Sequence, residues 1–287
     1  QLVVPHFGLH PMHAHQHAEE LSIDVMQDCC SWLSNLGDNA SPSPEPPAHP
    51  PSATPAWLAQ LCELLHKRPS AHVGETGLHK PGAGKGSLAS MPLQRQCLRL
   101  HLLAAQALGR CVTVHCVKAY GALLQELLAC APAKGTAQSG PMGGVAGGVS
   151  LPLGVPIVCH SYSGSADTTR QLCKLGAHFS ISGSVSNPSF KAVRAAAAHV
   201  PLDRLLLESD CPDQPLHKPR PAGGGEGGSA AQDFACCPGA DTSSDELRGP
   251  SAPWDVLETA AIVAGLRGCA RGAVLEAAAQ NAERLFH

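Results

Sequence analysis

The sequence predicts an α/β fold in which parallel strands alternate with helices around one large core. Short apolar runs of β-type residues alternate along the chain with longer segments of helical periodicity, as in repeated strand–helix units. Four of these runs end close to a residue that can bind a cation. Hydrophobic residues make up 44% of the 287 positions, enough for a sizeable core. We therefore expect a single domain over residues 1–287, built on a parallel sheet or barrel.

Six apolar runs are expected to form the strands, because each is short and is separated from the next by room for a helix and a loop. They are residues 2–10, 71–75, 111–116, 155–160, 177–182 and 204–210.

The segments between these runs predict helices. The clearest is 92–109, an amphipathic segment with Pro92 in its first turn and Gly109 at its C-terminal cap. The other expected helices are 17–36, 57–66, 119–130, 165–175, 188–199, 253–266 and 271–286.

Three stretches are expected to be mobile insertions rather than domain boundaries. Residues 41–56 contain seven prolines, which exclude a helix or a central strand. Residues 131–154 and 219–250 are rich in Gly, Ala, Ser and Pro, and such segments bury too little apolar surface to offset their ordering entropy.

Composition also limits the binding partners and the cellular compartment that we expect for this protein. The formal net charge of −3 argues against a protein that coats nucleic acid, although a bound metal would add local positive charge that this count omits. Thirteen cysteines without a repeated spacing or a CxxC pair indicate reduced thiols, in the cytoplasm or the nucleus. No apolar run is long enough to span a membrane, so no membrane partner is expected.

Four candidate metal ligands stand at the expected ends of four strands: Glu75, His115, His160 and Asp210. Their successive separations are 40, 45 and 50 residues. Polar groups at the carboxyl ends of parallel strands collect at one mouth. Imidazoles with carboxylates form a normal ligand set for Zn²⁺, Mn²⁺ or similar ions.

Each ligand also has a simpler interpretation. Taken alone, Glu75 is typical of a solvated loop and His115 of a satisfied rim histidine. Glu208 lies two residues before Asp210 and shares its face, but we expect Asp210 to face the site because it stands nearer the mouth. His10 also follows a strand and is expected to line the same mouth.

Histidines 13, 15 and 17 superficially offer an HxH pair. We expect a polar surface there rather than a metal site, because they follow the strand in a loop or a first helical turn.

Seven stretches taken together resemble the TatD family of metal-dependent deoxyribonucleases, which are amidohydrolase-like (β/α)8 TIM barrels. Gln94, 21 residues ahead of His115, stands at the family's usual interval. The matching stretches are FGLHP at 7–11, VGETGL at 73–78, TVHCVKA at 113–119, VCHSYSG at 158–164, HFSISG at 178–183, PLDRLLLESDCP at 201–212 and NAERLF at 281–286.

The resemblance implies a hydrolase of phosphodiester bonds in DNA that uses two divalent ions, Mg, Mn or Zn. The glutamate matching Glu75 bridges the two ions, and the histidines matching His115 and His160 hold one of them. The residue matching Asp210 binds the other ion and is the catalytic group that helps to activate water. His10 and Lys118, inside two of the matching stretches, are the expected substrate contacts.

Three departures from the family pattern stand out. The family opens with a strand that ends in an HxH pair for the first metal; here that strand and the next are absent, so the six expected strands correspond to strands three to eight of an incomplete, N-terminally truncated barrel. His79 stands where the family usually has Asp, and Cys111 where it usually has Pro.

Two other functions remain open. The missing HxH strand suits a catalytically silent barrel that acts as a binding or structural module. The ligand set also suits metal-dependent cleavage of an amide or an ester.

Overall fold

The computed structural model describes residues 3–38, 49–80, 89–131, 145–146, 149–150, 153–217 and 250–286. Most of the predicted insertions at 41–56, 131–154 and 219–250 lies outside these residues. Within the second insertion, β4 (Val145–Ala146) and β5 (Val149–Ser150) form a small antiparallel pair.

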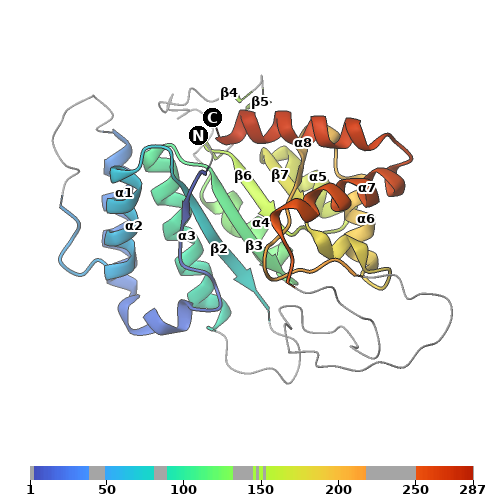
Figure 1. Cartoon of the computed structure of the whole chain (residues 1–287). Coiled ribbons are helices and arrows are strands. Elements are labelled where there is room, and N and C mark those ends of the chain that lie inside the picture. Colours follow the sequence, from blue (N-terminus) through green and yellow to red (C-terminus); the bar gives the residue numbers. More distant parts are fainter. Residues whose placement is uncertain are drawn as a thin grey trace.

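A six-stranded parallel sheet forms the centre of the fold, with strand order β1-β2-β3-β6-β7-β8 (Figure 1). All six predicted strands are present in chain order, and β1 and β8 are the edges of the sheet in the described part of the chain. The strands are β1 (His6–Phe7), β2 (His72–His79), β3 (Val112–Val117), β6 (Ile157–His160), β7 (Ala177–Ile181) and β8 (Leu205–Leu207).

The bounds of three strands differ from the prediction by three residues or more, and those of the other three by one or two residues. β1 has only two residues, because it begins after Pro5, which has no amide hydrogen to donate. β8 ends at Leu207 rather than at Asp210, whose φ of 52° is incompatible with an extended strand. β2 instead runs four residues past its predicted end at Glu75, because Gly77 lets it approach β3.

The helices follow the strands as predicted, with two exceptions. The predicted helix 253–266 begins as a 3-10 helix, Pro253–Asp255, and its α-helix starts at Val256. The segment predicted as a helix from residue 17 begins as a 3-10 helix, Ala14–Glu20, and the α-helix starts only at Ile23, because His17 has non-helical dihedral angles. The helices are α1 (Ile23–Asp38), α2 (Ala56–Lys67), α3 (Met91–Leu108), α4 (Tyr120–Ala129), α5 (Ala166–Lys174), α6 (Lys191–His199), α7 (Val256–Arg267) and α8 (Arg271–Phe286).

Helix α3 shows how local sequence sets an element. The Ser90 hydroxyl accepts a hydrogen bond from the amide of Leu93 at the start of the helix, and Pro92 occupies its first turn. Gly109 ends the helix with a left-handed φ of 62°, a conformation that glycine adopts without steric cost. The predicted caps of this helix are therefore confirmed.

Two separate apolar clusters cover the sheet. The larger cluster contains buried residues of helices α1 to α8 and of the strands. The smaller contains Cys111, Val158, Leu206 and Leu285, and it joins α8 to the amino ends of the strands. Figure 1 shows α8 across that end of the sheet, so the opposite, carboxyl end is the one available for a polar site.

Among the described helices, none combines the length and the hydropathy that a membrane span requires. The eleven described cysteines are all free thiols, most of them buried or half-buried.

Candidate metal centre

The register of the sheet brings the predicted ligands to one level. Gly77 of β2 pairs with His115 of β3, and His115 pairs with His160 of β6. The expectation that all four ligands end their strands is nevertheless wrong. Only His160 is the last residue of its strand; Glu75 lies inside β2, His115 inside β3 and Asp210 beyond β8. Because neighbouring strands are staggered, their register decides which residues share a level.

Gly77 sets the spacing between β2 and β3 at this level. Its φ is 150°, and a Cβ atom placed on it would overlap the carbonyl oxygen of His115. A side chain here would push β2 away from β3 and separate Glu75 from His115. Glu75 was expected at the end of its strand, whereas Gly77 acts inside a strand by permitting close approach.

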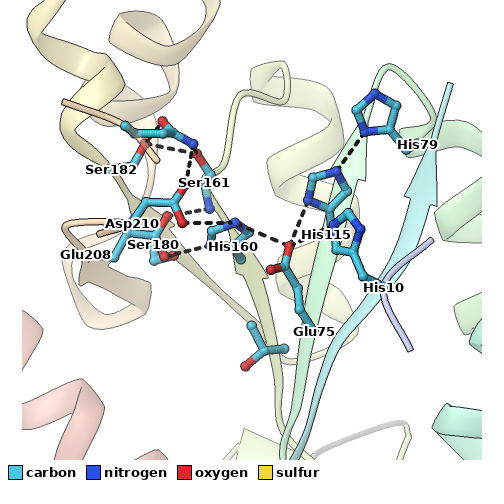
Figure 2. Close-up of polar contacts among 12 residues, drawn as sticks. His10, Glu75, His79, His115, His160, Ser161, Ser180, Ser182, Glu208 and Asp210 are labelled. Atoms are coloured by element: carbon cyan, nitrogen blue, oxygen red, sulfur yellow. Dashed lines mark hydrogen bonds and ion pairs between the residues drawn. The ribbon is translucent and has the colours of Figure 1, made fainter. Parts of the chain in front are cut away.

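Glu75 is the centre of the polar cluster (Figure 2). Its Oε1 accepts a hydrogen bond from Nδ1 of His115 at 2.7 Å. The same oxygen lies 3.3 Å from Nε2 of His160 and 3.6 Å from Nε2 of His10. One carboxylate oxygen therefore faces three imidazoles, which come from β3, from β6 and from the segment after β1.

The environment of Glu75 favours its ionised form. Burial alone would raise its pKa, but hydrogen bonds with His10 and His115, together with the nearby charge of His160, hold the pKa of this carboxyl well below its usual range. Burial lowers the pKa of His115, although Glu75 opposes that shift. The cluster thus presents a carboxylate and a predominantly neutral imidazole at neutral pH.

Glu208 binds His160 at Nδ1, the ring nitrogen that is turned away from Glu75. Nδ1 of His160 donates a hydrogen bond to Oε2 of Glu208 at 2.9 Å, and the hydroxyl of Ser180 donates to the same oxygen. Oε1 of Glu208 accepts from the amide of Ser161 at 2.7 Å. Burial opposes protonation of His160, yet Glu208 and Glu75 raise its pKa to about 10. Glu208 therefore fixes the direction in which Nε2 of His160 points.

Asp210 faces the cluster from the far side of His160. Its Oδ1 lies 3.8 Å from Nε2 of His160, and its Oδ2 accepts a hydrogen bond from the Gln214 side chain. Burial raises the pKa of Asp210 to about 6; Glu208 and Glu75 add to this shift, and His160 opposes it. Among the described residues, the Asp210 side chain forms its hydrogen bond with Gln214 and its ion pair with His160, so Asp210 lies at one end of the cluster.

His79 occupies the opposite end of the cluster. Its Nδ1 lies 2.9 Å from Nε2 of His115, the ring nitrogen that is turned away from Glu75. Burial, with the charges of His115, His10 and Lys118, lowers the pKa of His79 to about 4. Lys118 itself is exposed and directly follows β3, with a left-handed φ of 53°.

The sequence predicted the residues that meet at Glu75, but not most of the residues that form hydrogen bonds with them. Glu208 was considered only as a rival of Asp210, whereas both carboxylates lie next to His160. Ser161 and Ser180 lie inside two of the stretches that match the family, but they were not singled out, and Gln214 lies outside those stretches. The expected polar surface fits the exposure of His13 and His15, and the candidate metal-binding group found among the described residues contains neither.

The donor set fits a divalent cation. One ligand atom from each of His10, Glu75 and His115 lies within 4.8 Å of the other two. Nε2 of His160 is also directed at Glu75. Imidazole nitrogens combined with a carboxylate oxygen suit Zn²⁺, Mn²⁺ and related ions. Glu75, His115 and His160, with His10 beside them, are therefore the residues that would hold such an ion.

Comparison with known proteins places the chain in a family. The model for TatD related DNase matches residues 1–287, so the chain belongs to that family. It is 36% identical over 66 residues to an uncharacterized metal-dependent hydrolase of Haemophilus influenzae, a match that covers 23% of this chain and 25% of the relative. It is 37% identical over 60 residues to the uncharacterized metal-dependent hydrolase YjjV of Escherichia coli, covering 21% and 23% respectively. The matches thus span about a quarter of these curated relatives.

Solved structures share the fold at low sequence identity. The crystal structure of YjjV, a TatD homolog from Escherichia coli, superposes with a TM-score of 0.56 and 22% identity, over 80% of this chain and 69% of that one. An uncharacterized amidohydrolase from Saccharomyces cerevisiae gives a TM-score of 0.61 and 17% identity, over 98% and 80% respectively. The α/β fold with its parallel sheet is thereby supported, while the two strands expected to be missing before β1 stay a prediction.

Proposed function

Because the chain belongs to the TatD related DNase family, we propose that it is a divalent-metal-dependent hydrolase that cleaves phosphodiester bonds in DNA. The observation that carries this proposal is the convergence of two imidazoles on one oxygen of Glu75, at 2.7 Å from His115 and 3.3 Å from His160. The relatives named above, both described as metal-dependent hydrolases, support the coarser part of the proposal.

Glu75, His115 and His160 would hold one ion. When bound, a divalent ion at such a site lowers the pKa of water and stabilises the charge that develops on a phosphate. The resemblance implies a second ion, but its HxH pair is among the features expected to be missing from this sequence. We propose that Asp210 lies on the side of the centre where this second ion would be held.

Asp210 is the proposed proton acceptor. A carboxylate with a pKa near 6 is ionised at neutral pH and can take a proton from an attacking water at Oδ1. The Gln214 side chain holds Oδ2 and so fixes the direction of the other oxygen. Glu208 is the weaker candidate for this role, because both of its oxygens already accept hydrogen bonds from the protein.

Substrate contact is proposed for His10 and Lys118. His10 is half-buried beside Glu75, and the exposed ammonium group of Lys118 follows the strand that carries His115. A phosphate at the mouth would meet these positive or hydrogen-bonding groups. With a net charge of −3, the chain as a whole would hold DNA weakly. The free thiols of the described cysteines suit the proposed cytoplasmic or nuclear setting.

The test is Mn²⁺- or Mg²⁺-dependent cleavage of single-stranded DNA by the purified chain and by Glu75→Ala and Asp210→Ala variants. Both substitutions should remove the activity, while Glu63→Ala, at an exposed position on α2, should not. Activity that survives both site substitutions would exclude this site.

A panel of ester and amide substrates covers the third possible function. Turnover of those substrates without phosphodiester cleavage would exclude the nuclease. Absence of any turnover, even with two strands that carry an HxH pair restored before β1, would favour a silent binding module.

A further inference from the structure

His79 is held in place more firmly than an incidental neighbour of the site would be. It is the last residue of β2 and is 3% exposed. Its amide donates to Oε1 of the buried Gln94 at 2.7 Å, and its carbonyl accepts from Nε2 of the same side chain at 3.1 Å. The two bonds to His79 join α3 to the end of β2. Gln94 also donates to the carbonyl of Ala89 at 2.7 Å. The backbone of His79 therefore has little freedom to move its ring.

The ring of His79 meets His115 edge to edge. Nδ1 of His79 lies 2.9 Å from Nε2 of His115, and the two ring planes differ by 10° (Figure 2). This distance requires one hydrogen between the two nitrogens. The contact therefore links the tautomer of one ring to that of the other.

The same arrangement recurs at the other histidine of the centre. His160 turns Nε2 toward Glu75 and its outer nitrogen, Nδ1, toward Glu208. His115 turns Nδ1 toward Glu75 and its outer nitrogen, Nε2, toward His79. Metal-binding histidines regularly give their outer N–H group to a partner that fixes the ring and its tautomer. Glu208 is such a partner for His160, and His79 stands in the corresponding place for His115.

We propose that His79 is the positioning residue of His115, which sets the tautomer in which Nδ1 is available to a divalent ion. This inference rests on the proposed function, because it takes the metal centre as its premise. Without an ion, Nδ1 of His115 carries the hydrogen that Glu75 accepts, so Nε2 accepts the hydrogen on Nδ1 of His79.

An ion held at this centre would call for the opposite tautomer of both rings. Nδ1 of His115 would present its lone pair, and its ring hydrogen would lie on Nε2, from which it would be donated to Nδ1 of His79. His79 would then carry its own hydrogen on Nε2. Each ring keeps one hydrogen throughout, so the total number of bound protons does not change.

The identity of residue 79 then adjusts the affinity for metal. A carboxylate, the usual group at this position in the family that the sequence resembles, would attract the N–H group of His115 more strongly than a neutral imidazole does. The carboxylate would make Nδ1 of His115 a better donor to the ion. The imidazole of His79 therefore gives this chain a weaker hold on its metal than an aspartate would.

The first experiment measures Zn²⁺ affinity by competition with a chelator, using the chain freed of metal with EDTA. His79→Phe should weaken binding about 10- to 100-fold, because Nε2 of His115 loses its acceptor. His79→Asn should stay close to wild type, because its side-chain oxygen can accept the same hydrogen, and His79→Asp should bind about tenfold more tightly. Equal affinities for His79→Phe and His79→Asn would overturn the proposal.

The second experiment observes the tautomers by long-range ¹H–¹⁵N NMR of the whole chain, with and without Zn²⁺. Zinc should move the hydrogen of His115 from Nδ1 to Nε2 and that of His79 from Nδ1 to Nε2. A zinc-induced shift showing that His79 itself binds the ion, or no change at His79, would contradict the positioning role.

Two further variants separate failure of this inference from failure of the proposed function. Glu75→Ala should abolish zinc binding, and His66→Phe, at an exposed histidine on α2, should leave it unchanged. If Glu75→Ala abolishes zinc binding while the three His79 variants all bind zinc like wild type, the metal centre is supported and the positioning role of His79 is wrong. If Glu75→Ala also binds normally, the metal centre itself is wrong.

Discussion

His160 and His115 face the same oxygen of Glu75, yet the groups that hold them from behind differ in charge. Glu208 places a carboxylate behind His160, whereas His79 places an imidazole behind His115. The carboxylates raise the pKa of His160 to about 10, against the effect of burial, while burial lowers the pKa of His115. The two histidines of one centre therefore differ in pKa, chiefly because Glu208 lies beside His160, whereas burial outweighs the effect of Glu75 at His115.

The largest effect should come from removing the group that the two sides share. Glu75→Gln keeps the shape of the side chain but removes its charge, so both His115 and His160 lose the negative charge that they share. We expect zinc binding to be lost and hydrolysis to fall by about 10³-fold or more, measured by chelator competition and by DNA cleavage. Glu63→Gln, on the exposed face of α2, is the matched control and should behave like wild type.

Asp210→Asn should separate chemistry from metal binding. Among the described residues, the ion pair of Asp210 is with His160 and not with Glu75, so the ion held by Glu75 should remain while cleavage falls by about 10²- to 10⁴-fold. Steady-state rates and zinc affinity are measured on the same preparation. A loss of zinc affinity as large as that of Glu75→Gln would show that Asp210 is itself a ligand of the ion held by Glu75.

Glu208→Gln tests the carboxylate side of the comparison directly. It should weaken zinc binding about 10- to 100-fold, and by more than His79→Phe, because the group lost carries a full charge. Ser180→Ala removes one hydrogen bond to Glu208 without touching His160 and should cost much less. If Glu208→Gln and His79→Phe were equal in effect, the charge behind a ligand would not matter here.

The last prediction needs no substitution. It concerns the protonation states of His160 and His115 in the metal-free wild-type chain at pH 8. His160, whose pKa is raised to about 10, should be an imidazolium below that value. His115, whose pKa is lowered below 6.5, should be neutral. Ring ¹⁵N chemical shifts measured in EDTA distinguish the two forms. Finding both rings neutral would remove the electrostatic difference between the two sides.

Much of the fold followed from local sequence patterns. The caps of α3, Pro92 and Gly109, act within a single turn, so their residue types alone located the helix. The six strands were found because each is a continuous apolar run. Strand bounds were less accurate: hydrophobicity does not report the dihedral angles that end β8 before Asp210, or the glycine that lets β2 continue past Glu75.

The site divides in the same way. The sequence alone determined the candidate ligand types, because strand-forming runs followed by His, Glu or Asp can be read locally. Only the tertiary structure decided that the oxygen of Glu75 lies between His115 and His160, since this depends on the stagger of three strands. It also decided that Glu208 and His79 stand behind the two histidines. Contacts of this kind join residues that are tens of positions apart, and they form only when the sheet sets its register.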